Sequence, residues 1–329
     1  MMKFPELRMS RNGPPAAYIK MPAFFFLLLV MCCSSFTGVV SAQEIRSRAA
    51  VAMDAETGRV LYAKNPDRFL MPASTTKLIT ALVVLDNARL GDVVTISARA
   101  AKTPPEKIGL KKGERVTIET LLHAALIKSA NDAAVALAEA VAGTEKEFVK
   151  LMNKKAVEIG AENTRFINAS GLPGKGQHIT AYDLAKIMGE AIKSPVLKEI
   201  LNKLVTEVST ESGRSVVITN TNKLLWHDED IVGGKTGYTR QARHCFVCFG
   251  TRENDAIIVA VLGAPNRATL WKESERLIDF AAKVMNDEEE PEVYLTKSGD
   301  ASCLDGKPSY TKKGKKKRKR SGHAAKTKI

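Results

Sequence analysis

The sequence predicts a two-lobed α+β fold, in which one sheet is built from distant parts of the chain and a helical lobe is inserted between them. Three observations support this fold class. Strand patterns occur at residues 49–62, helical patterns dominate residues 74–201, and short apolar runs return after residue 205. Because the two strand-rich regions are far apart in the chain, the sheet must join distant segments. The crevice between the lobes is the expected place for a ligand.

Each element has a local signal. The first hairpin is indicated by two strand-like runs around a turn, at Ala49–Met53, Asp54–Gly58 and Val60–Tyr62. Helices are indicated by apolar residues at helical spacing, such as Leu78 and Leu82. By the same criteria we predict further helices at Lys146–Ile159, Ala181–Ile192 and Thr269–Met285, and strands at Val216–Thr219, Cys245–Phe249 and Ala256–Leu262.

Residues 1–42 have the layout of a secretory signal peptide. The uncharged run Ala23–Cys33 follows Lys20 and is followed by small residues that end at Ala42. This run is shorter than the roughly 20 apolar residues that span a bilayer. We therefore expect cleavage after Ala42 and export to the periplasm or the extracytoplasmic face of the cell membrane. An uncleaved anchor is the alternative.

The chain has 329 residues, of which 44% are hydrophobic, and a formal net charge of +14 that is unevenly distributed. Residues 1–20 contribute +3 and residues 307–329 contribute +11, so residues 21–306 carry no net charge. A neutral body with a basic tail differs from a basic nucleic-acid-binding domain. We expect residues 288–329 to be a polar linker and a disordered basic tail. The tail either aids solubility or binds anionic lipid or an acidic envelope polymer, and an exported protein is not expected to bind nucleic acid.

The cysteines and histidines do not predict a metal site. Cys245 and Cys248 have C-x-x-C spacing, but both lie in a run predicted to be a strand. Residues three apart on a strand point to opposite faces, so two buried thiols are favoured over a redox pair or a metal site. The five histidines show no metal-ligand spacing. We expect neither a metal nor another cofactor.

The first string of candidate catalytic residues is Ser74-Thr-Thr-Lys77, at the start of a predicted apolar helix. Residues i and i+3 share a helix face, so the Lys77 amine can approach the Ser74 hydroxyl. A lysine can activate a serine once burial or a second cation lowers the lysine pKa. The helix start also offers backbone N–H groups to an oxyanion. An ordinary helix start is the alternative, and S-x-x-K recurs at Ser309-Tyr-Thr-Lys312 in the predicted tail.

Two further strings contain similar residues. Ser129-Ala-Asn131 lies between two helical patterns, where a helix cap is the alternative interpretation. Lys235-Thr236-Gly237 lies in the strand-rich final third, where glycine on a strand edge lets a ligand backbone come close. An ammonium and a hydroxyl at that position suit a substrate carboxylate. A turn is the alternative for this string.

In this order the three strings resemble the low-molecular-mass penicillin-binding proteins, and among them the D-alanyl-D-alanine carboxypeptidase family (serine peptidase family S11). The resemblance covers Ile45 to Met285. It extends to the strings Ala52-Met53-Asp54, Gly58-Arg59-Val60-Leu61, Gly171-Leu172, Thr180-Ala181-Tyr182-Asp183-Leu184 and Asn220-Thr221-Asn222. It implies a catalytic domain at residues 43–287 with a β-lactamase/transpeptidase-like fold, an antiparallel sheet flanked by helices plus a helical lobe.

The resemblance also implies catalytic roles. Ser74 would be the acylated nucleophile and Lys77 its general base. Ser129 would pass a proton to the leaving group, and Asn131 would hold the substrate amide. β-Lactams would acylate Ser74 because their amide mimics the D-Ala-D-Ala bond.

Substrate binding is implied for the third string and the residue after it. Lys235 and Thr236 would receive the terminal carboxylate of the stem peptide, and Gly237 would allow its close approach. The backbone N–H groups of Ser74 and Tyr238 would form the oxyanion hole.

The chain departs from the family pattern at two places. Glycine is usual at the position of Arg243, whose long cation would lie near the sheet edge and affect substrate entry. The segment Asn168-Ala169-Ser170-Gly171 replaces a frequent Pro-His-Gly form, which bears on the deacylation rate. In addition, Asn220-Thr221-Asn222 resembles D,D-endopeptidases that cut cross-links.

We therefore expect an exported serine-type D,D-carboxypeptidase that removes the terminal D-Ala of peptidoglycan stem peptides, with roles in cell-wall biogenesis and cell shape. A D,D-endopeptidase that uses the same residues is the main alternative. A class A β-lactamase is disfavoured, because Glu158 to Pro173 contains no clear equivalent of its deacylating glutamate. A peptidoglycan-binding scaffold without turnover is disfavoured by the intact Ser74, Lys77 and Lys235.

Overall fold

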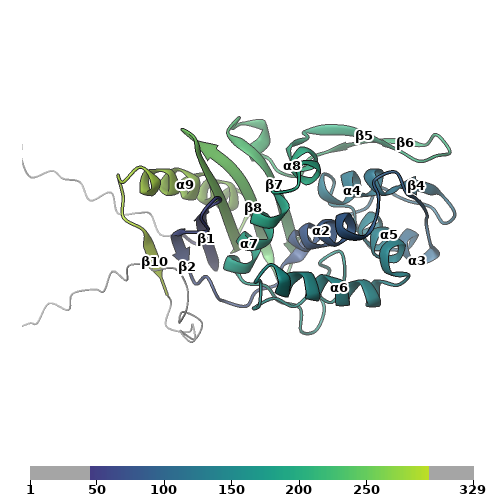
Figure 1. The fold of residues 1–329 in the computed structure, drawn as a ribbon, viewed down its shortest axis with the longest axis horizontal. Coiled ribbons are helices and arrows are strands. Elements are labelled where there is room, and N and C mark those ends of the chain that lie inside the picture. Colours follow the sequence, from purple (N-terminus) through teal and green to yellow (C-terminus); the bar gives the residue numbers. More distant parts are fainter. Residues whose placement is uncertain (1–44, 296–329) are drawn as a thin grey trace, which may run out of the picture. The chain divides into compact units, whose positions relative to one another are not determined.

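A computed structural model describes residues 45–295 of the chain (Figure 1). The predicted signal peptide, residues 1–42, and the predicted basic tail, residues 307–329, lie outside the described residues. The predicted catalytic domain, residues 43–287, falls almost wholly within them. No helix within residues 45–295 combines the length and the apolar character needed to cross a membrane.

A six-stranded sheet forms the centre of the described region. Its strand order is β10-β2-β1-β9-β8-β7, and all neighbours are antiparallel except β10 and β2. The strands are β1 Ala49–Asp54, β2 Val60–Lys64, β7 Ile231–Thr239, β8 Arg243–Arg252, β9 Asp255–Ala264 and β10 Glu292–Tyr294. Because β1 pairs with β9, the two ends of the folded region meet in one sheet, and the predicted α+β fold is confirmed.

Strand β10 lies inside the segment predicted to be a polar linker. It pairs in parallel with β2, and the Asn65 backbone N–H donates to the Tyr294 carbonyl at 2.9 Å. The ring of Tyr294 also packs on that of Tyr62, with centroids 5.7 Å apart. The start of the predicted linker therefore belongs to the sheet, because the free edge of β2 offers backbone groups that a short extended segment can pair with.

Helices cover both faces of the sheet. Helix α9, Arg267–Met285, contributes to the core on one face, whereas α2, Lys77–Asn87, and α7, Ala181–Ala191, contribute to the core on the other. Cys248 belongs to the core shared with α9, and Cys245 to the opposite core. Both are buried free thiols, as the alternation of side chains along a strand predicted.

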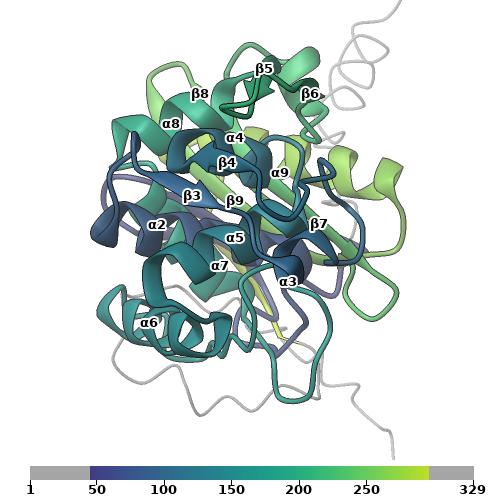
Figure 2. The same ribbon diagram turned by 90° about the vertical axis from the view of Figure 1, so that its right-hand side faces the viewer.

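The helical lobe lies beside the sheet (Figures 1 and 2). Its further helices are α3 Ala98–Ala101, α4 Ile118–Leu126, α5 Asn131–Ala142 and α6 Glu145–Glu158, and α8 Pro195–Asn202 contacts both α4 and β7. Several helices begin where a side chain can cap them. Thr117, Thr144 and Thr180 each accept a hydrogen bond from the backbone N–H three residues later.

Two small hairpins complete the described region. They are β3 Val93–Thr95 with β4 Arg115–Thr117, and β5 Val205–Ser209 with β6 Ser215–Thr219. The first was not predicted. The predicted strand Val216–Thr219 exists, but it pairs with β5 and not with the central sheet. A short apolar run indicates a strand without indicating its partner, because the partner comes from elsewhere in the chain.

Candidate active site

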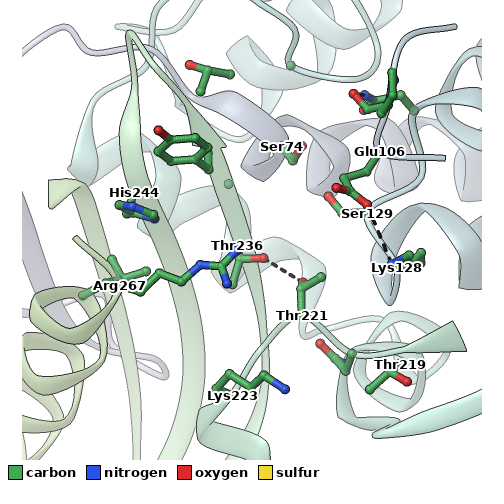
Figure 3. A pocket seen from close by; sticks show the side chains of 18 of the residues that line it. Ser74, Glu106, Lys128, Ser129, Thr219, Thr221, Lys223, Thr236, His244 and Arg267 are labelled. Carbon is green, nitrogen blue, oxygen red and sulfur yellow. Dashed lines mark hydrogen bonds and ion pairs between the residues drawn. The ribbon is translucent and has the colours of Figure 1, made fainter. Parts of the chain in front are cut away.

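The predicted site residues gather around one cavity of about 550 Å³ (Figure 3). Six of them, from three separate parts of the chain, line it: Ser74, Ser129, Asn131, Thr236, Gly237 and Tyr238. The other two, Lys77 and Lys235, are buried next to these residues, with 0% and 1% of their surface exposed. The cavity lies where the helical lobe meets the edge strand β7.

Ser74 lies in a short 3-10 turn, Ala73–Thr76, that leads directly into α2. Lys77 is the first residue of α2, and its Nζ atom lies 3.0 Å from Ser74 Oγ. The starts of the turn and of the helix have no side-chain cap, so Ser74 is not the helix cap that was the alternative interpretation. The i, i+3 spacing brings the two functional groups together.

Lys77 Nζ has two more hydrogen-bond partners. It donates to Asn131 Oδ1 and to the backbone carbonyl of Ser170, both at 2.8 Å. These two oxygens can only accept hydrogen bonds, whereas the Ser74 hydroxyl can donate or accept. A neutral amine, with two hydrogens and one lone pair, can donate to both oxygens and accept the proton of the Ser74 hydroxyl with its lone pair.

The surroundings of Lys77 favour this neutral amine. Burial lowers the pKa of Lys77 well below its usual range, and the nearby cation of Lys235 lowers it further. The carboxylate of Asp132 acts in the opposite direction. Both causes of a lowered pKa that the sequence suggested, desolvation and a second cation, are present.

Asn131 is held in one orientation. Its Nδ2 group donates to the carbonyls of Pro104 and Pro105 at 3.2 and 3.0 Å, and its backbone N–H donates to the carbonyl of Glu106 at 2.7 Å. The Oδ1 atom is left to face Lys77. These contacts fix the amide group and also tie the loop at residues 104–106 to the site.

Asp132 was not predicted as a site residue, although it directly follows the Ser-x-Asn string. Its side chain is fully buried and accepts hydrogen bonds from the backbone N–H groups of Ile108, Gly109 and Leu110, at 3.0 to 3.3 Å. It therefore places a negative charge near Lys77 and holds the loop that precedes the site. Sequence reasoning missed this role because the donors are backbone groups from another segment.

Ser129 connects the helical lobe to the sheet. It lies between α4 and α5 with φ of +66°, and its Oγ accepts a hydrogen bond from Lys235 Nζ at 2.9 Å. Lys235 Nζ also donates to the carbonyl of Thr236 at 3.1 Å, and burial lowers the pKa of Lys235 to about 7. Helix α5 begins after Ala130 without a side-chain cap, so neither Ser129 nor Asn131 caps it.

The third string lies on β7 at the edge of the sheet and not in a turn. Thr236 Oγ1 donates to Thr221 Oγ1 at 2.7 Å. At Gly237 a Cβ atom would lie 2.9 Å from the backbone nitrogen of Ser74. Glycine is therefore required for β7 to approach the backbone of the nucleophile this closely.

The segment Asn168–Gly171 contributes a backbone group to the site. The Ser170 carbonyl holds Lys77, and Asn168 Oδ1 accepts from the Gly171 N–H at 2.7 Å. Gly171 has φ of +83°, and a Cβ atom there would lie 1.8 Å from the carbonyl oxygen of Ala73. The sequence identified this segment only as a departure, because a backbone carbonyl is not marked by any residue type.

The rim of the cavity includes residues of β7 and β8. Tyr238 is 58% exposed, and its ring lies 4.5 Å from that of His244, which also lines the cavity. Arg243 begins β8 with φ of +61°, a conformation that favours glycine. Its side chain is exposed and does not line the cavity, so the structure provides no contact for the expected effect on substrate entry.

Four charged residues on the cavity wall were not predicted, namely Glu106, Lys128, Lys223 and Arg267. Glu106 and Lys128 form an ion pair at 3.7 Å. Within residues 45–295, Glu106 is the only carboxylate that lines the cavity. The described part of the chain contains no group of three or more His, Cys, Asp or Glu side chains that could hold a metal ion.

The chain is similar to known cell-wall enzymes. The model of the family described as D-alanyl-D-alanine carboxypeptidase matches residues 37–266. The D-alanyl-D-alanine carboxypeptidase DacF of Bacillus subtilis is 35% identical over 240 residues, which are 71% of this chain and 62% of DacF. A D-alanyl-D-alanine endopeptidase of Escherichia coli is 33% identical over 243 residues, which are 72% of this chain and 77% of that relative.

The fold is also similar to solved structures. The D-alanyl-D-alanine carboxypeptidase of Mycobacterium tuberculosis superimposes with a TM-score of 0.71 at 30% identity, and the match covers 75% of this chain and 94% of that one. The chain spans less than two thirds of the length of DacF.

Proposed function

Because the chain belongs to the D-alanyl-D-alanine carboxypeptidase family, we propose that it removes the terminal D-Ala of peptidoglycan stem peptides by acylation and deacylation of Ser74. The position of Lys77 carries this proposal. Its Nζ lies 3.0 Å from Ser74 Oγ, while Asn131 Oδ1 and the Ser170 carbonyl take its N–H groups. A serine hydroxyl beside an oriented, uncharged amine is a nucleophile with its general base.

In the proposed acylation step, Lys77 takes the proton of Ser74 while Ser74 Oγ attacks the carbonyl carbon of the penultimate D-Ala. The carbonyl oxygen becomes an oxyanion, which the backbone N–H groups of Ser74 and Tyr238 would stabilise. The close approach of Gly237 to the Ser74 nitrogen supports this assignment, because it brings the β7 backbone beside the nucleophile.

Breaking the peptide bond requires a proton for the leaving amine. We propose that the Ser129 hydroxyl donates it and is reprotonated by Lys235, which donates to Ser129 at 2.9 Å. The Lys235 ammonium is 1% exposed and does not line the cavity, so it would act on the substrate through Ser129 and through its charge. The terminal carboxylate would bind the Thr236 hydroxyl, and the nearby charge of the Lys235 ammonium would attract it.

Deacylation requires a water molecule and a base. Glu106 is the only carboxylate that lines the cavity in the described part of the chain, and it is paired with Lys128. We therefore propose that Lys77 is again the base, held by the same two oxygens, once it has released the Ser74 proton to solvent and Lys235 has regained its own. Lys77 then takes a proton from the attacking water and returns it to Ser74 Oγ as the ester bond breaks. This differs from a class A β-lactamase, in which a glutamate activates the deacylating water.

The proposed substrate lies outside the cytoplasm, which is consistent with the signal peptide predicted at residues 1–42. Cleavage after Ala42, the extracytoplasmic location, and binding of the basic tail to anionic lipid or envelope polymer stay predictions, because both segments lie outside the described residues.

The proposal is tested with the purified chain, a stem pentapeptide and penicillin. We expect release of free D-Ala, and mass spectrometry should find one penicillin bound to the peptide that contains Ser74. Ser74→Ala should abolish both signals. The matched control is Ser309→Ala, which removes the serine of the second S-x-x-K string and should change neither. Labelling that persists in Ser74→Ala would refute the nucleophile, and labelling without D-Ala release would indicate a penicillin-binding scaffold.

A D,D-endopeptidase is the second candidate. It is favoured by the extent of the cavity, which continues past Thr236 to Thr219 and Thr221, and by the 33% identity to the endopeptidase of Escherichia coli. Product analysis on purified sacculi separates the two activities. A carboxypeptidase releases D-Ala and leaves cross-linked dimers intact, whereas an endopeptidase converts dimers to monomers.

A further inference from the structure

We infer that Lys223 and Arg267 form a second anion subsite in the cavity, which binds an additional carboxylate on the leaving residue of the substrate. This inference rests on the proposed function, since it extends the binding of the leaving group. The substrate class is peptides in which the residue after the scissile bond carries an acidic side chain.

The two cations come from different elements but share one part of the cavity. Arg267 is the first residue of α9, and Lys223 follows the hairpin β5–β6. Both line the cavity. In Figure 3 the guanidinium of Arg267 lies next to Thr236, and Lys223 lies below Thr221, the hydrogen-bond partner of Thr236. Burial lowers the pKa of His244, which also lines the cavity, and the charge of Arg267 lowers it further.

This part of the cavity is on the leaving-group side. In the proposed reaction the substrate carbonyl lies at Ser74, and the carboxylate next to the scissile bond lies at Thr236. Thr221 contacts Thr236 at 2.7 Å, and Lys223 is two residues further along the chain. A leaving residue whose side chain extends beyond its own carboxylate would therefore meet these cations.

The charges of Lys223 and Arg267 are not compensated within residues 45–295. Neither side chain forms an ion pair with a carboxylate there, and Lys223 contacts the ring of Trp226, 5.7 Å from its centroid. Among the residues that the structure describes, Glu106 is the only carboxylate that lines the cavity, and it is paired with Lys128. Two uncompensated cations in one concave site attract an anion, and an arginine suits a carboxylate in particular.

The backbone that carries Lys223 is firmly held. Asn220 and Asn222 are 2% and 0% exposed. Asn220 Nδ2 donates to the Lys203 carbonyl at 2.9 Å, and Asn220 Oδ1 accepts from the Asn222 N–H at 2.9 Å. The Thr221 N–H donates to the Ile127 carbonyl at 3.2 Å. The Asn-Thr-Asn string thus places Thr221 and Lys223 in the cavity before any substrate binds.

The ligand chemistry follows from these positions. A terminal D-Ala has one carboxylate, which Thr236 would already bind, so it has no group for Lys223 and Arg267. A leaving residue with an acidic side chain has a second carboxylate for them. Leu270 and Trp271 line the same cavity and would contact the methylene groups between the two carboxylates.

The test uses three peptides with the same acyl donor, ending in D-Ala-D-Ala, D-Ala-D-α-aminoadipate, or D-Ala-D-α-aminoadipate with its side-chain carboxylate converted to the amide. We expect the purified chain to cleave the acid with a kcat/KM about tenfold above that of the isosteric amide. Lys223→Gln and Arg267→Gln should each reduce this ratio to below about threefold. Penicillin acylation and cleavage of D-Ala-D-Ala should change by less than about twofold.

Lys272→Gln is the matched control, because Lys272 is an exposed cation on the same helix as Arg267 and does not line the cavity. The ratio of kcat/KM for the acid to that for the amide should be the same in this variant as in the unmodified chain. If the unmodified chain shows no preference for the acid over the amide, the inference is overturned and the proposed function is not affected. Equal losses on all three peptides in Arg267→Gln also overturn it, because they would place Arg267 at the first carboxylate. Failure of penicillin to label Ser74 in the unmodified chain would instead overturn the proposed function, and the inference with it.

Discussion

Lys235 on the edge strand β7 donates a hydrogen bond to Ser129 on the helical lobe at 2.9 Å. This contact spans the boundary between the two lobes. Burial lowers the pKa of Lys77 on the other side of the site, and the charge of Lys235 lowers it further. Lys235 therefore contacts the second string through Ser129 and acts on the first string through its charge. Removal of the Lys235 charge should raise the proton affinity of Lys77.

The pH dependence of acylation should be bell-shaped. Lys77 must be neutral to accept a proton, and its pKa is lowered, so kcat/KM should rise with pH well below the usual range of lysine. Lys235 must be charged in the proposed mechanism, and its pKa is about 7, so kcat/KM should fall as the pH increases through that value. Because a bound carboxylate favours the ammonium, the falling limb should lie at higher pH in kcat than in kcat/KM. Stopped-flow acylation from about pH 5 to about pH 10 measures this, and a rate that still rises at the upper end contradicts it.

Asp132→Asn should shift the rising limb of that profile to lower pH. The carboxylate of Asp132 raises the pKa of Lys77, so its removal lowers that pKa further. An amide has one acceptor oxygen, so it can serve Gly109 and Leu110 or Ile108 and Ala133 but not both pairs, which should destabilise the protein by about 2–4 kcal/mol in urea unfolding. Asp86→Asn removes a half-exposed charge elsewhere on α2 and is the control. An unchanged profile in Asp132→Asn would show that its charge does not act on Lys77.

Gly237→Ala should impair catalysis more than folding. The new Cβ would lie 2.9 Å from the Ser74 nitrogen and would displace a proposed oxyanion donor, so we expect acylation to slow by about 100-fold. Gly91→Ala, where no atom lies within 4 Å of the added Cβ, should leave acylation unchanged. Penicillin acylation rates of the two variants make the comparison, and an unimpaired Gly237→Ala would remove β7 from the oxyanion site.

Arg243→Gly should stabilise the protein without changing activity. Arg243 has φ of +61°, which strains any residue except glycine, so we expect a gain of about 0.5–1 kcal/mol. Arg240→Gly, an exposed arginine in the adjoining turn that is not among the residues with positive φ, should not stabilise. Denaturant unfolding compares the two variants. A loss of D-Ala release in Arg243→Gly would restore the expected role of Arg243 in substrate entry.

Cys245 and Cys248 should be unreactive in the folded protein. Burial raises the pKa of both thiols to about 12, and the two side chains lie on opposite faces of β8. Alkylation at about pH 8 followed by peptide mapping should label them only after unfolding. A disulfide between them in the native protein would contradict the placement of β8.

Local patterns predicted the elements that the structure contains. The hairpin of β1 and β2, the helices α6, α7 and α9, and the strands β8 and β9 all follow from periodicity and turn residues. These signals depend on neighbours in the chain, so they are available before folding. They could not assign β6 to its partner β5 or show that β10 completes the sheet, because strand pairing depends on distant segments.

The three chemical strings were also visible in the sequence, and their order identified the family. The chain alone thus determined which side chains carry chemistry, since residue identity and spacing are local properties. Only the tertiary structure decided that the Ser170 carbonyl orients Lys77, that Lys235 is buried against Ser129, and that Lys223 and Arg267 share a cavity. Those relationships depend on burial and on charges brought together from distant positions, and proton affinity follows from both.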